Sequence, residues 1–175
     1  MKKITSFRRR ILKIKMIFIP DGPDGDRKRG RLYEPYLKSF GENLKVGSQA
    51  FIFNPNGLSV GNHVYIGFNS YLGQGEIELM DEVLIGNFVS ITASNHLIKN
   101  GSFRFGGYHA EKIKIGRGTW IGAGASITAG VSIGASCLIA SGAVVTKNFD
   151  DKLIIGGVPS KVIGNIDEFN KKHEK

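Results

Sequence analysis

The sequence has little cysteine and no long apolar run, and each shortage excludes something. With Cys137 as its single cysteine, the chain cannot form an internal disulfide, which is typical of proteins of a reducing cytoplasm. No apolar run is long enough to cross a membrane. The N-terminus also lacks the uninterrupted apolar stretch and the cleavage site of a secretory signal. We therefore expect a cytoplasmic protein, with peripheral contact to the inner face of the membrane as an open alternative.

The sequence also lacks the motifs of several common ligand sites. Its four histidines do not have the spacing of metal ligands, and no cysteine cluster accompanies them. The glycine-rich stretches lack the strand–turn–helix context of nucleotide-binding loops. No nucleic-acid-binding motif or aromatic platform accompanies the basic residues. We therefore predict no metal site and no nucleic-acid partner.

Glycine is abundant, with 24 residues, and many of them recur within a period of six. Residues 115–150 consist of hexads that each open with isoleucine or valine: IGRGTW, IGAGAS, ITAGVS, IGASCL, IASGAV and VTKNFD. This period fits neither an α-helix nor an alternating strand. It predicts an all-β solenoid that turns a corner every six residues, with the aliphatic openers inside. We expect positive φ at the glycines of the Ile-Gly pairs, and a buried, unreactive thiol at Cys137.

The same register extends upstream with interruptions. Aliphatic openers recur six residues apart at Val60, Ile66 and Leu72 and, after a shift of one residue, at Leu79, Ile85 and Ile91. Residues 97–112, LIKNGSFRFGGYHAEK, do not follow the pattern and begin directly after His96. Long loops without structure of their own are usually functional. We therefore predict a functional loop, extruded from the coil at about 97–112.

The net charge of +9 is concentrated near the N-terminus. Residues 1–31 hold 11 basic and 3 acidic residues, a net charge of +8. Apolar residues such as Phe7, Ile11, Ile14 and Phe18 are interleaved with these charges in a partly helical pattern. Two interpretations stay open: a helix packed on its own domain, or a membrane-surface helix within residues 1–20 that is drawn to anionic lipid. The segment DGPDGDRKRG that follows is typical of a linker or surface loop.

Three motifs beyond the hexads indicate a family. WIG at residues 120–122, VTK at 145–147 and GGVPSKVI at 156–163, together with the hexads, resemble the hexapeptide-repeat acyltransferases, among them the galactoside, maltose and polysaccharide O-acetyltransferases. The resemblance covers about residues 44–165. It implies a left-handed parallel β-helix there, preceded by a basic leader and linker (1–43) and followed by a charged tail (166–175). It also implies a homotrimer that binds acetyl-CoA in clefts between subunits.

The resemblance further implies roles for individual residues. Acetyl transfer to a sugar hydroxyl needs a base, and His96 falls where the family has its catalytic histidine; His109, inside the same loop, is the second candidate. The backbone N–H of Ala123 is implied as the oxyanion donor. Asn69 is implied as a contact to the acceptor sugar, with a turn role as its alternative. The residues on the family's coenzyme A positions are Ala123, Ser141, Thr146, Lys147 and Lys161.

The resemblance therefore implies an acetyl-CoA-dependent O-acetyltransferase that acts on a sugar hydroxyl in the synthesis of cell-surface polysaccharide or lipopolysaccharide. The enzymatic alternative is N-acetylation of an amino sugar, such as one linked to a nucleotide, because the same scaffold serves both reactions. A non-catalytic β-helix that forms a scaffold trimer is the alternative from a different class. The presence of His96, Thr146, Lys147 and the loop disfavours it.

Overall fold

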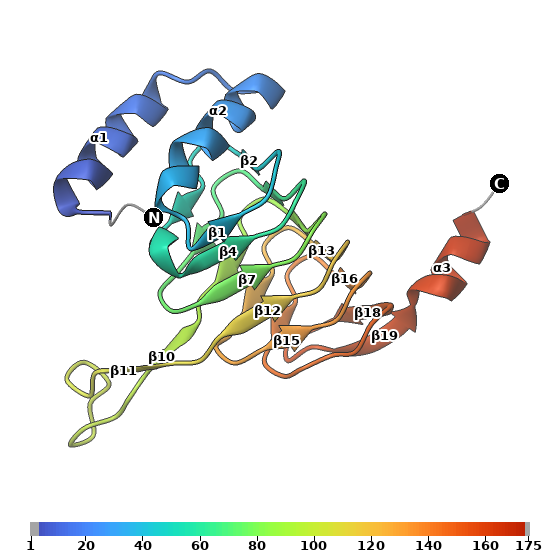
Figure 1. Cartoon of the computed structure of the whole chain (residues 1–175). Helices are drawn as coiled ribbons and strands as arrows, with labels where there is room; N and C mark the ends of the chain where they lie inside the picture. The colour runs from blue at the N-terminus through green and yellow to red at the C-terminus, as the bar shows by residue number, and fades with distance from the viewer. Residues whose placement is uncertain (1–3, 174–175) are drawn as a thin grey trace.

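The computed structural model describes residues 4–173, which form a parallel β-helix with α-helices at its two ends (Figure 1). The chain visits three sheets in turn, so that about six turns stack into a prism with three faces. The predicted left-handed parallel β-helix is confirmed. Strands are short because the chain turns a corner after each of them.

The three faces, here called sheets A, B and C, are made of parallel strands that come from successive coils. Sheet A contains β1 (Ser39–Phe40), β4 (Leu58–Val60), β7 (Ile77–Leu79), β12 (Ile113–Ile115) and β15 (Ser132–Ile133). Sheet B contains β2 (Lys45–Val46), β5 (Tyr65–Ile66), β8 (Leu84–Ile85), β13 (Trp120–Ile121), β16 (Leu138–Ile139) and β18 (Leu153–Gly156), with β19 (Lys161–Asn165) antiparallel at its end. Sheet C contains β3 (Phe51–Ile52), β6 (Tyr71–Leu72), β9 (Ser90–Ile91), β14 (Ser126–Ile127) and β17 (Val144–Val145).

The hexad openers fill the interior of the prism, as the period predicts. Ile121, Ile127, Ile133 and Ile139 are all at most 2% exposed. The fifth hexad position is also internal, and Cys137 is buried there with its Sγ 3.1 Å from the carbonyl oxygen of Asp150. Burial raises the pKa of this thiol, so the thiolate needed for reactivity is disfavoured.

The glycines of the Ile-Gly pairs serve a different purpose from the one expected. Their φ angles are not positive; positive φ falls instead at the fourth hexad position, at Gly118, Gly124, Gly130, Ser136 and Gly142. A Cβ at Gly122 would lie 2.6 Å from the carbonyl oxygen of Ile139 on the next coil. The second position therefore requires glycine because neighbouring coils approach closely there. The corner itself turns two residues later.

The predicted extruded loop is present, and its base is a hairpin. After Ala93 the chain leaves the prism and forms β10 (Ser94–His96) and β11 (Tyr108–Ala110), which pair antiparallel with His96 opposite Tyr108. The coil then resumes at β12, which pairs with β7. Figure 1 shows the hairpin as an arm that projects from the body of the prism.

Two helices cover the N-terminal end of the prism. Thr5 caps α1 (Ser6–Ile17), and α2 (Pro23–Tyr33) packs against β2. Residues 23–30, which composition predicted as linker or loop, therefore lie in a helix. Pro23 and two aspartates favour the first turn of α2, and the buried Arg29 bonds Asp26 and the carbonyl oxygen of Val46. This tertiary contact outweighs the turn-forming composition.

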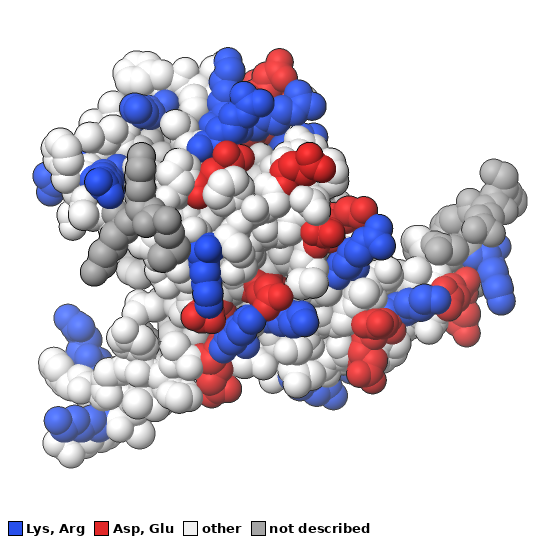
Figure 2. All heavy atoms as spheres, in the orientation of Figure 1, with Lys and Arg blue, Asp and Glu red and all other residues white. Residues whose placement is uncertain are grey.

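Charges are distributed as the sequence predicts. Figure 2 shows Lys and Arg gathered over the N-terminal helices and mixed with Asp and Glu along the coils. Lys112–Glu78 and Arg117–Glu82 are ion pairs between neighbouring coils, and Lys38–Glu76 is an ion pair that spans the intervening coil of β4. The chain continues through short 3-10 helices at Glu34–Tyr36 and Pro55–Gly57, and ends in α3 (Ile166–His173), which points away from the prism (Figure 1). Within residues 4–173, no helix has the length and apolar character needed to cross a membrane.

Candidate active site

Apart from Lys161, the residues predicted for the site lie on two of the three corners of the prism. Edge BC, where the chain passes from sheet B to sheet C, consists of residues 47–50, 67–70, 86–89, 122–125 and 140–143. Edge CA, where it passes from sheet C to sheet A, consists of residues 53–57, 73–76, 92–112, 128–131 and 146–149. Sheet C lies between the two edges.

Edge CA carries the candidate base. His96 ends β10 and its side chain is exposed. The hairpin base is fixed to the coils, because the N–H of Ala93 donates to the carbonyl oxygen of Gln74 (3.0 Å) and the N–H of Glu111 donates to that of Ala93 (3.1 Å). His96 is thus held three residues from a fixed point while its imidazole faces solvent. Thr146 and Lys147, on the same edge, are also exposed.

Edge BC carries the candidate oxyanion donor. At three other corners, the N–H at the third hexad position donates to a side chain of the next coil: Asn62 to Asp81, Phe68 to Asn87 and Ala135 to Asp151. Ala123 occupies this position too, but no residue of the described range 4–173 accepts its N–H. The carbonyl oxygen of Ala123 accepts from Gly142 (2.9 Å). The corner is therefore fixed while its N–H stays available to a ligand.

Asn69 and Ser141 lie on the same edge BC as Ala123. Asn69 is exposed, has a φ of 54°, and donates its N–H to the carbonyl oxygen of Ser48 (3.0 Å). It therefore has the geometry of a turn residue, and that geometry leaves its amide side chain at the surface. Ser141 lies one coil beyond Ala123 and is also exposed.

Lys161 begins β19 beyond the last complete coil. Its neighbour Ser160 donates its N–H to the carbonyl oxygen of Val144 (2.9 Å), which places this turn next to edge BC. The Lys161 side chain is exposed. Lys147 lies on the other edge, with its Nζ 5.6 Å from the centre of the Phe149 ring. The two candidate phosphate-binding cations thus flank sheet C.

One chain does not bring the candidate base and the candidate oxyanion donor together. Ala123 and Thr128 mark the two ends of one crossing of sheet C and are five residues apart in sequence. At about 3.3 Å per residue in a strand, the edges are roughly 16 Å apart. A proton acceptor on edge CA therefore cannot reach a group bound at edge BC of the same chain.

The other histidines do not occupy comparable positions. His109 pairs opposite Asn95 in β11, and its Nε2 lies 3.5 Å from Oε1 of Glu111, an ion pair only when the imidazole is protonated. His63 lies at the third corner, where the chain passes from sheet A to sheet B. It is exposed, with its Nδ1 3.0 Å from Nδ2 of Asn43. Among the described residues, no three His, Cys, Asp or Glu side chains are grouped to hold a metal ion.

The structure adds candidate residues that the sequence analysis missed. Phe88 lies on edge BC between Asn69 and Ala123, is 56% exposed, and has a φ of 58°, which is unfavourable for a bulky side chain. Its ring meets that of Phe68 edge to face at 5.4 Å. A phenylalanine at a fourth hexad position, where downstream coils carry glycine or serine, was the signal that could have revealed it.

A second addition is a polar hollow of about 540 Å³ at edge CA, next to the hairpin base. It is lined by Asn54, Asn56, Gly57, Gly75, Glu76, Ala110 and Lys112. Hydrogen bonding to Lys38 lowers the pKa of Glu76, so its carboxylate is charged at neutral pH. Carboxylate and ammonium groups can bind sugar hydroxyls. The sequence analysis missed this hollow because its residues come from three separated segments that the hexad pattern does not relate.

Known proteins resemble the chain in sequence. Residues 112–147 match the family described as bacterial transferase hexapeptide (six repeats). The galactoside O-acetyltransferase of Escherichia coli (strain K12) is 28% identical over 152 residues, which cover 86% of this chain and 75% of that protein. The dTDP-4-amino-4,6-dideoxy-D-glucose acyltransferase of Escherichia coli is 24% identical over 162 residues, which cover 76% of this chain and 84% of that protein.

Solved structures resemble it over nearly its whole length. A galactoside acetyltransferase in complex with coenzyme A superposes with a TM-score of 0.79 at 27% identity and covers 94% of this chain and 84% of its own. The maltose O-acetyltransferase from Clostridium difficile 630 superposes with a TM-score of 0.78 at 26% identity, over 91% of this chain and 87% of that one. Fold and sequence therefore indicate the same group of proteins.

Proposed function

The chain belongs to the hexapeptide-repeat acyltransferases, and from this premise we propose that it transfers an acetyl group from acetyl-CoA to a hydroxyl group of a sugar. The names of its relatives support this acceptor, and the coenzyme A complex of a galactoside acetyltransferase supports this donor. The observation that carries the proposal is the hairpin, because it interrupts the coils to present His96 at edge CA.

The residues present fit a coenzyme A thioester. The N–H of Ala123 is available at edge BC, and the exposed cations Lys147 and Lys161 can pair with phosphates. Each lysine offers a point charge and not the bidentate fork of an arginine. When bound, acetyl-CoA supplies an activated acetyl group and a thiol leaving group.

His96 is the general base in this proposal. Its imidazole accepts the proton of the sugar hydroxyl as the hydroxyl oxygen forms its bond to the acetyl carbon, and it can return that proton to the leaving sulfur. The N–H of Ala123 donates to the oxygen on which negative charge develops. In this proposal Asn69 and Phe88, which lie on the same edge as Ala123, hold the acceptor sugar.

We propose that the working unit is a homotrimer. His96 and Ala123 lie on different edges, roughly 16 Å apart across sheet C. A closed ring of identical subunits can place edge CA of one protomer against edge BC of the next, which builds a complete site at each contact. The hexapeptide-repeat family is typically trimeric.

N-acylation of an amino sugar is the second candidate. It is favoured by the similarity to an acyltransferase named for an amino sugar linked to dTDP. An amine is a better nucleophile than a hydroxyl and needs less help from a base. The two reactions are therefore separated by how strongly turnover depends on His96.

We further propose a role in the synthesis of cell-surface polysaccharide or lipopolysaccharide, with peripheral contact to an anionic membrane through residues 1–20. Phe7 and Ile14 of α1 and its C-cap residue Phe18 are between 56% and 80% exposed, and basic residues lie on both sides of this apolar face. Lys2 and Lys3 of the leader lie outside the described residues. Each basic residue near such a membrane contributes about 1 kcal/mol, screened by salt.

The test is incubation of the protein with acetyl-CoA and a panel of neutral, amino and nucleotide-linked sugars, followed by mass spectrometry. We expect an acetylated sugar whose acetyl group is removed by hydroxylamine, as for an ester. An acetyl group that resists hydroxylamine indicates an amide and supports the second candidate. If no sugar is acetylated while acetyl-CoA binds, the proposal is wrong.

A further inference from the structure

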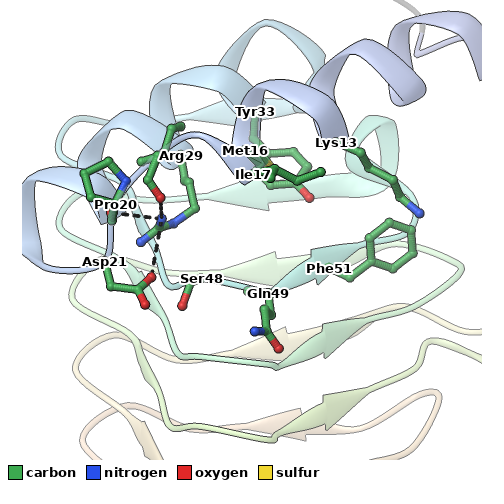
Figure 3. A pocket seen from close by; sticks show the side chains of 12 residues that line it. Lys13, Met16, Ile17, Pro20, Asp21, Arg29, Tyr33, Ser48, Gln49 and Phe51 are labelled. Carbon is green, nitrogen blue, oxygen red and sulfur yellow. Dashed lines mark hydrogen bonds and ion pairs between the residues drawn. The ribbon is translucent and has the colours of Figure 1, made fainter.

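A groove of about 610 Å³ lies between α1, the turn into α2 and the first coil (Figure 3). Much of its lining is apolar, with Met16, Ile17 and Ile19 on the helical side and Ala50 and Phe51 on the coil side. Ile17, which lines the groove on the helical side, is 77% exposed, so this wall of the groove faces solvent. A surface hollow with such a lining favours an apolar ligand.

The groove adjoins edge BC one coil below the candidate acceptor contact. Ser48 and Gln49 line the groove, and the carbonyl oxygen of Ser48 accepts the N–H of Asn69 on the next coil. Neighbouring coils are about 4.8 Å apart. A sugar held at Asn69 and Phe88 therefore has its substituent within reach of the groove.

The charges around the groove favour a negatively charged group at one of its ends. Helix α1, SFRRRILKIKMI, contains no acidic residue. Lys13 lies at one end of the groove, with its Nζ 4.7 Å from the centre of the Phe51 ring, which holds the ammonium group at the rim (Figure 3). At the other end, Asp21 faces the buried Arg29 at 3.9 Å (Figure 3). The Lys13 end is thus the site for an anion.

We propose that this groove binds an apolar chain that carries the acceptor sugar, with an anionic linking group such as a phosphate at Lys13. This inference rests on the proposed function, because it takes the sugar to be the acetyl acceptor at edge BC. It narrows the acceptor to one chemical class, an anionic amphiphilic glycoside. Only the chain and the linking group occupy the groove, and the sugar lies beyond it.

A direct test uses octyl phosphate, which carries the chain and the anion but no sugar. We expect full-length protein to bind it in isothermal titration calorimetry, at concentrations below micelle formation. Ile17→Glu places a carboxylate in the groove at an exposed position, so folding should be unaffected and affinity should fall about tenfold or more. Ile14→Glu makes the same change on the same helix, but Ile14 does not line the groove.

The two variants decide between the groove and the outer face of α1. Binding that Ile17→Glu removes and Ile14→Glu retains supports the proposal. Equal loss in both variants assigns octyl phosphate to the exposed apolar face of α1, and absence of binding to the unaltered protein removes the groove as a site. Either of these results overturns the proposal. Lys13→Gln should weaken binding of octyl phosphate and leave binding of uncharged octyl glucoside unchanged.

A kinetic test separates this proposal from the proposed function. For methyl, butyl and octyl glycosides of the sugar that is acetylated, KM should fall about two- to fourfold per buried methylene while kcat stays constant. Ile17→Glu should abolish the dependence on chain length but not the acetylation of the methyl glycoside. If the sugar is acetylated but KM does not depend on chain length, the proposal about the groove is wrong and the proposed function stands. If no sugar is acetylated but octyl phosphate binds in the groove, the proposed function fails and the groove remains an anionic amphiphile site.

Discussion

At the scale of single residues, corner N–H groups differ: some donate to a side chain of the next coil, and others, that of Ala123 among them, have no acceptor within the described residues. Asn87, Asp81 and Asp151 each accept the corner N–H of the preceding coil. Ser141 stands at the equivalent place beyond Ala123, and no hydrogen bond joins the two at that N–H within the described residues. A backbone donor that the fold leaves unpaired is suited to a charge that develops during reaction, because it needs no reorganisation.

The first prediction concerns His96. His96→Gln keeps the size and polarity of the side chain but removes the base, so kcat for a hydroxyl acceptor should fall by about 10² to 10⁴. Binding of coenzyme A, measured by calorimetry, should change little, because His96 is not among the residues proposed to hold coenzyme A, and its exposed side chain takes no part in the coil.

His109→Gln is the matched control, since His109 belongs to the same hairpin. It should retain nearly full turnover. If His109→Gln is the inactive variant and His96→Gln is active, the assignment of the base is wrong. A fall much below a hundredfold in His96→Gln points to an amine acceptor.

The second prediction concerns Phe88, whose φ of 58° costs a bulky residue about 1 kcal/mol. Asparagine tolerates this conformation, as Asn69 does at the equivalent corner of the preceding coil. Phe88→Asn should therefore not destabilise the protein towards urea, despite the loss of an exposed aromatic ring. It should also raise KM for the acceptor without changing KM for acetyl-CoA. Unchanged acceptor KM would falsify a role for the ring in acceptor binding.

At the scale of elements, sequence analysis succeeded where the period persists and failed where tertiary contacts decide. The hexads between Ile115 and Asp150 determine the coil, because each opener has only one way to reach the interior. The extruded segment after His96 was also predictable, since it breaks the register. Its paired base was not, because the pairing of Ser94–His96 with Tyr108–Ala110 leaves no periodic signal over three residues.

Helix α2 shows the opposite case, in which the local composition was misleading. Glycines and aspartates in residues 21–30 are typical of turns, yet Gly30 is required because a Cβ there would lie 2.1 Å from the carbonyl oxygen of Leu44. The aspartates belong to the first turn of the helix and to the ion pair with Arg29. Both reasons depend on what α2 packs against, which local sequence does not reveal.

The third prediction tests that packing. Arg29 is 2% exposed, and its guanidinium bonds Asp26 and the carbonyl oxygens of Val46, Ile19 and Pro20. Arg29→Leu leaves the carboxylate of Asp26 and these carbonyls without the donor, which should lower the free energy of unfolding by about 3–5 kcal/mol. Urea denaturation measures this.

Arg27→Leu is the control on the same helix. Arg27 pairs with Asp24 at 3.0 Å, but both side chains are largely in solvent, so the free energy of unfolding should change by about 0.5 kcal/mol or less. If the two variants unfold at the same urea concentration, Arg29 does not anchor α2 to the first coil.

At the scale of the whole molecule, the arrangement of candidate residues is itself an argument about assembly. His96, Thr146 and Lys147 lie on edge CA, whereas Asn69, Ala123 and Ser141 lie on edge BC. In the proposed reaction, a complete set of groups around one thioester requires both edges, which one prism holds apart across sheet C. The sequence could place each residue in its hexad, but the separation of the edges emerges only when the coils are stacked.

The fourth prediction follows from this separation. His96→Gln should be inactive for lack of a base, and Ala123→Pro should be inactive because proline removes the N–H that no described residue uses in folding. When equal amounts of the two variants are unfolded and reassembled together, mixed rings form. A contact in which the first protomer supplies His96 and the second supplies the N–H of residue 123 then has both groups. With random assortment, about a quarter of the contacts should be complete, so about a quarter of the unaltered activity should return.

Light scattering should show that each variant alone keeps the same mass as the unaltered protein. If the mixture stays as inactive as its components while mixed rings are present, each site is built within one chain, and the two edges do not cooperate across a subunit contact.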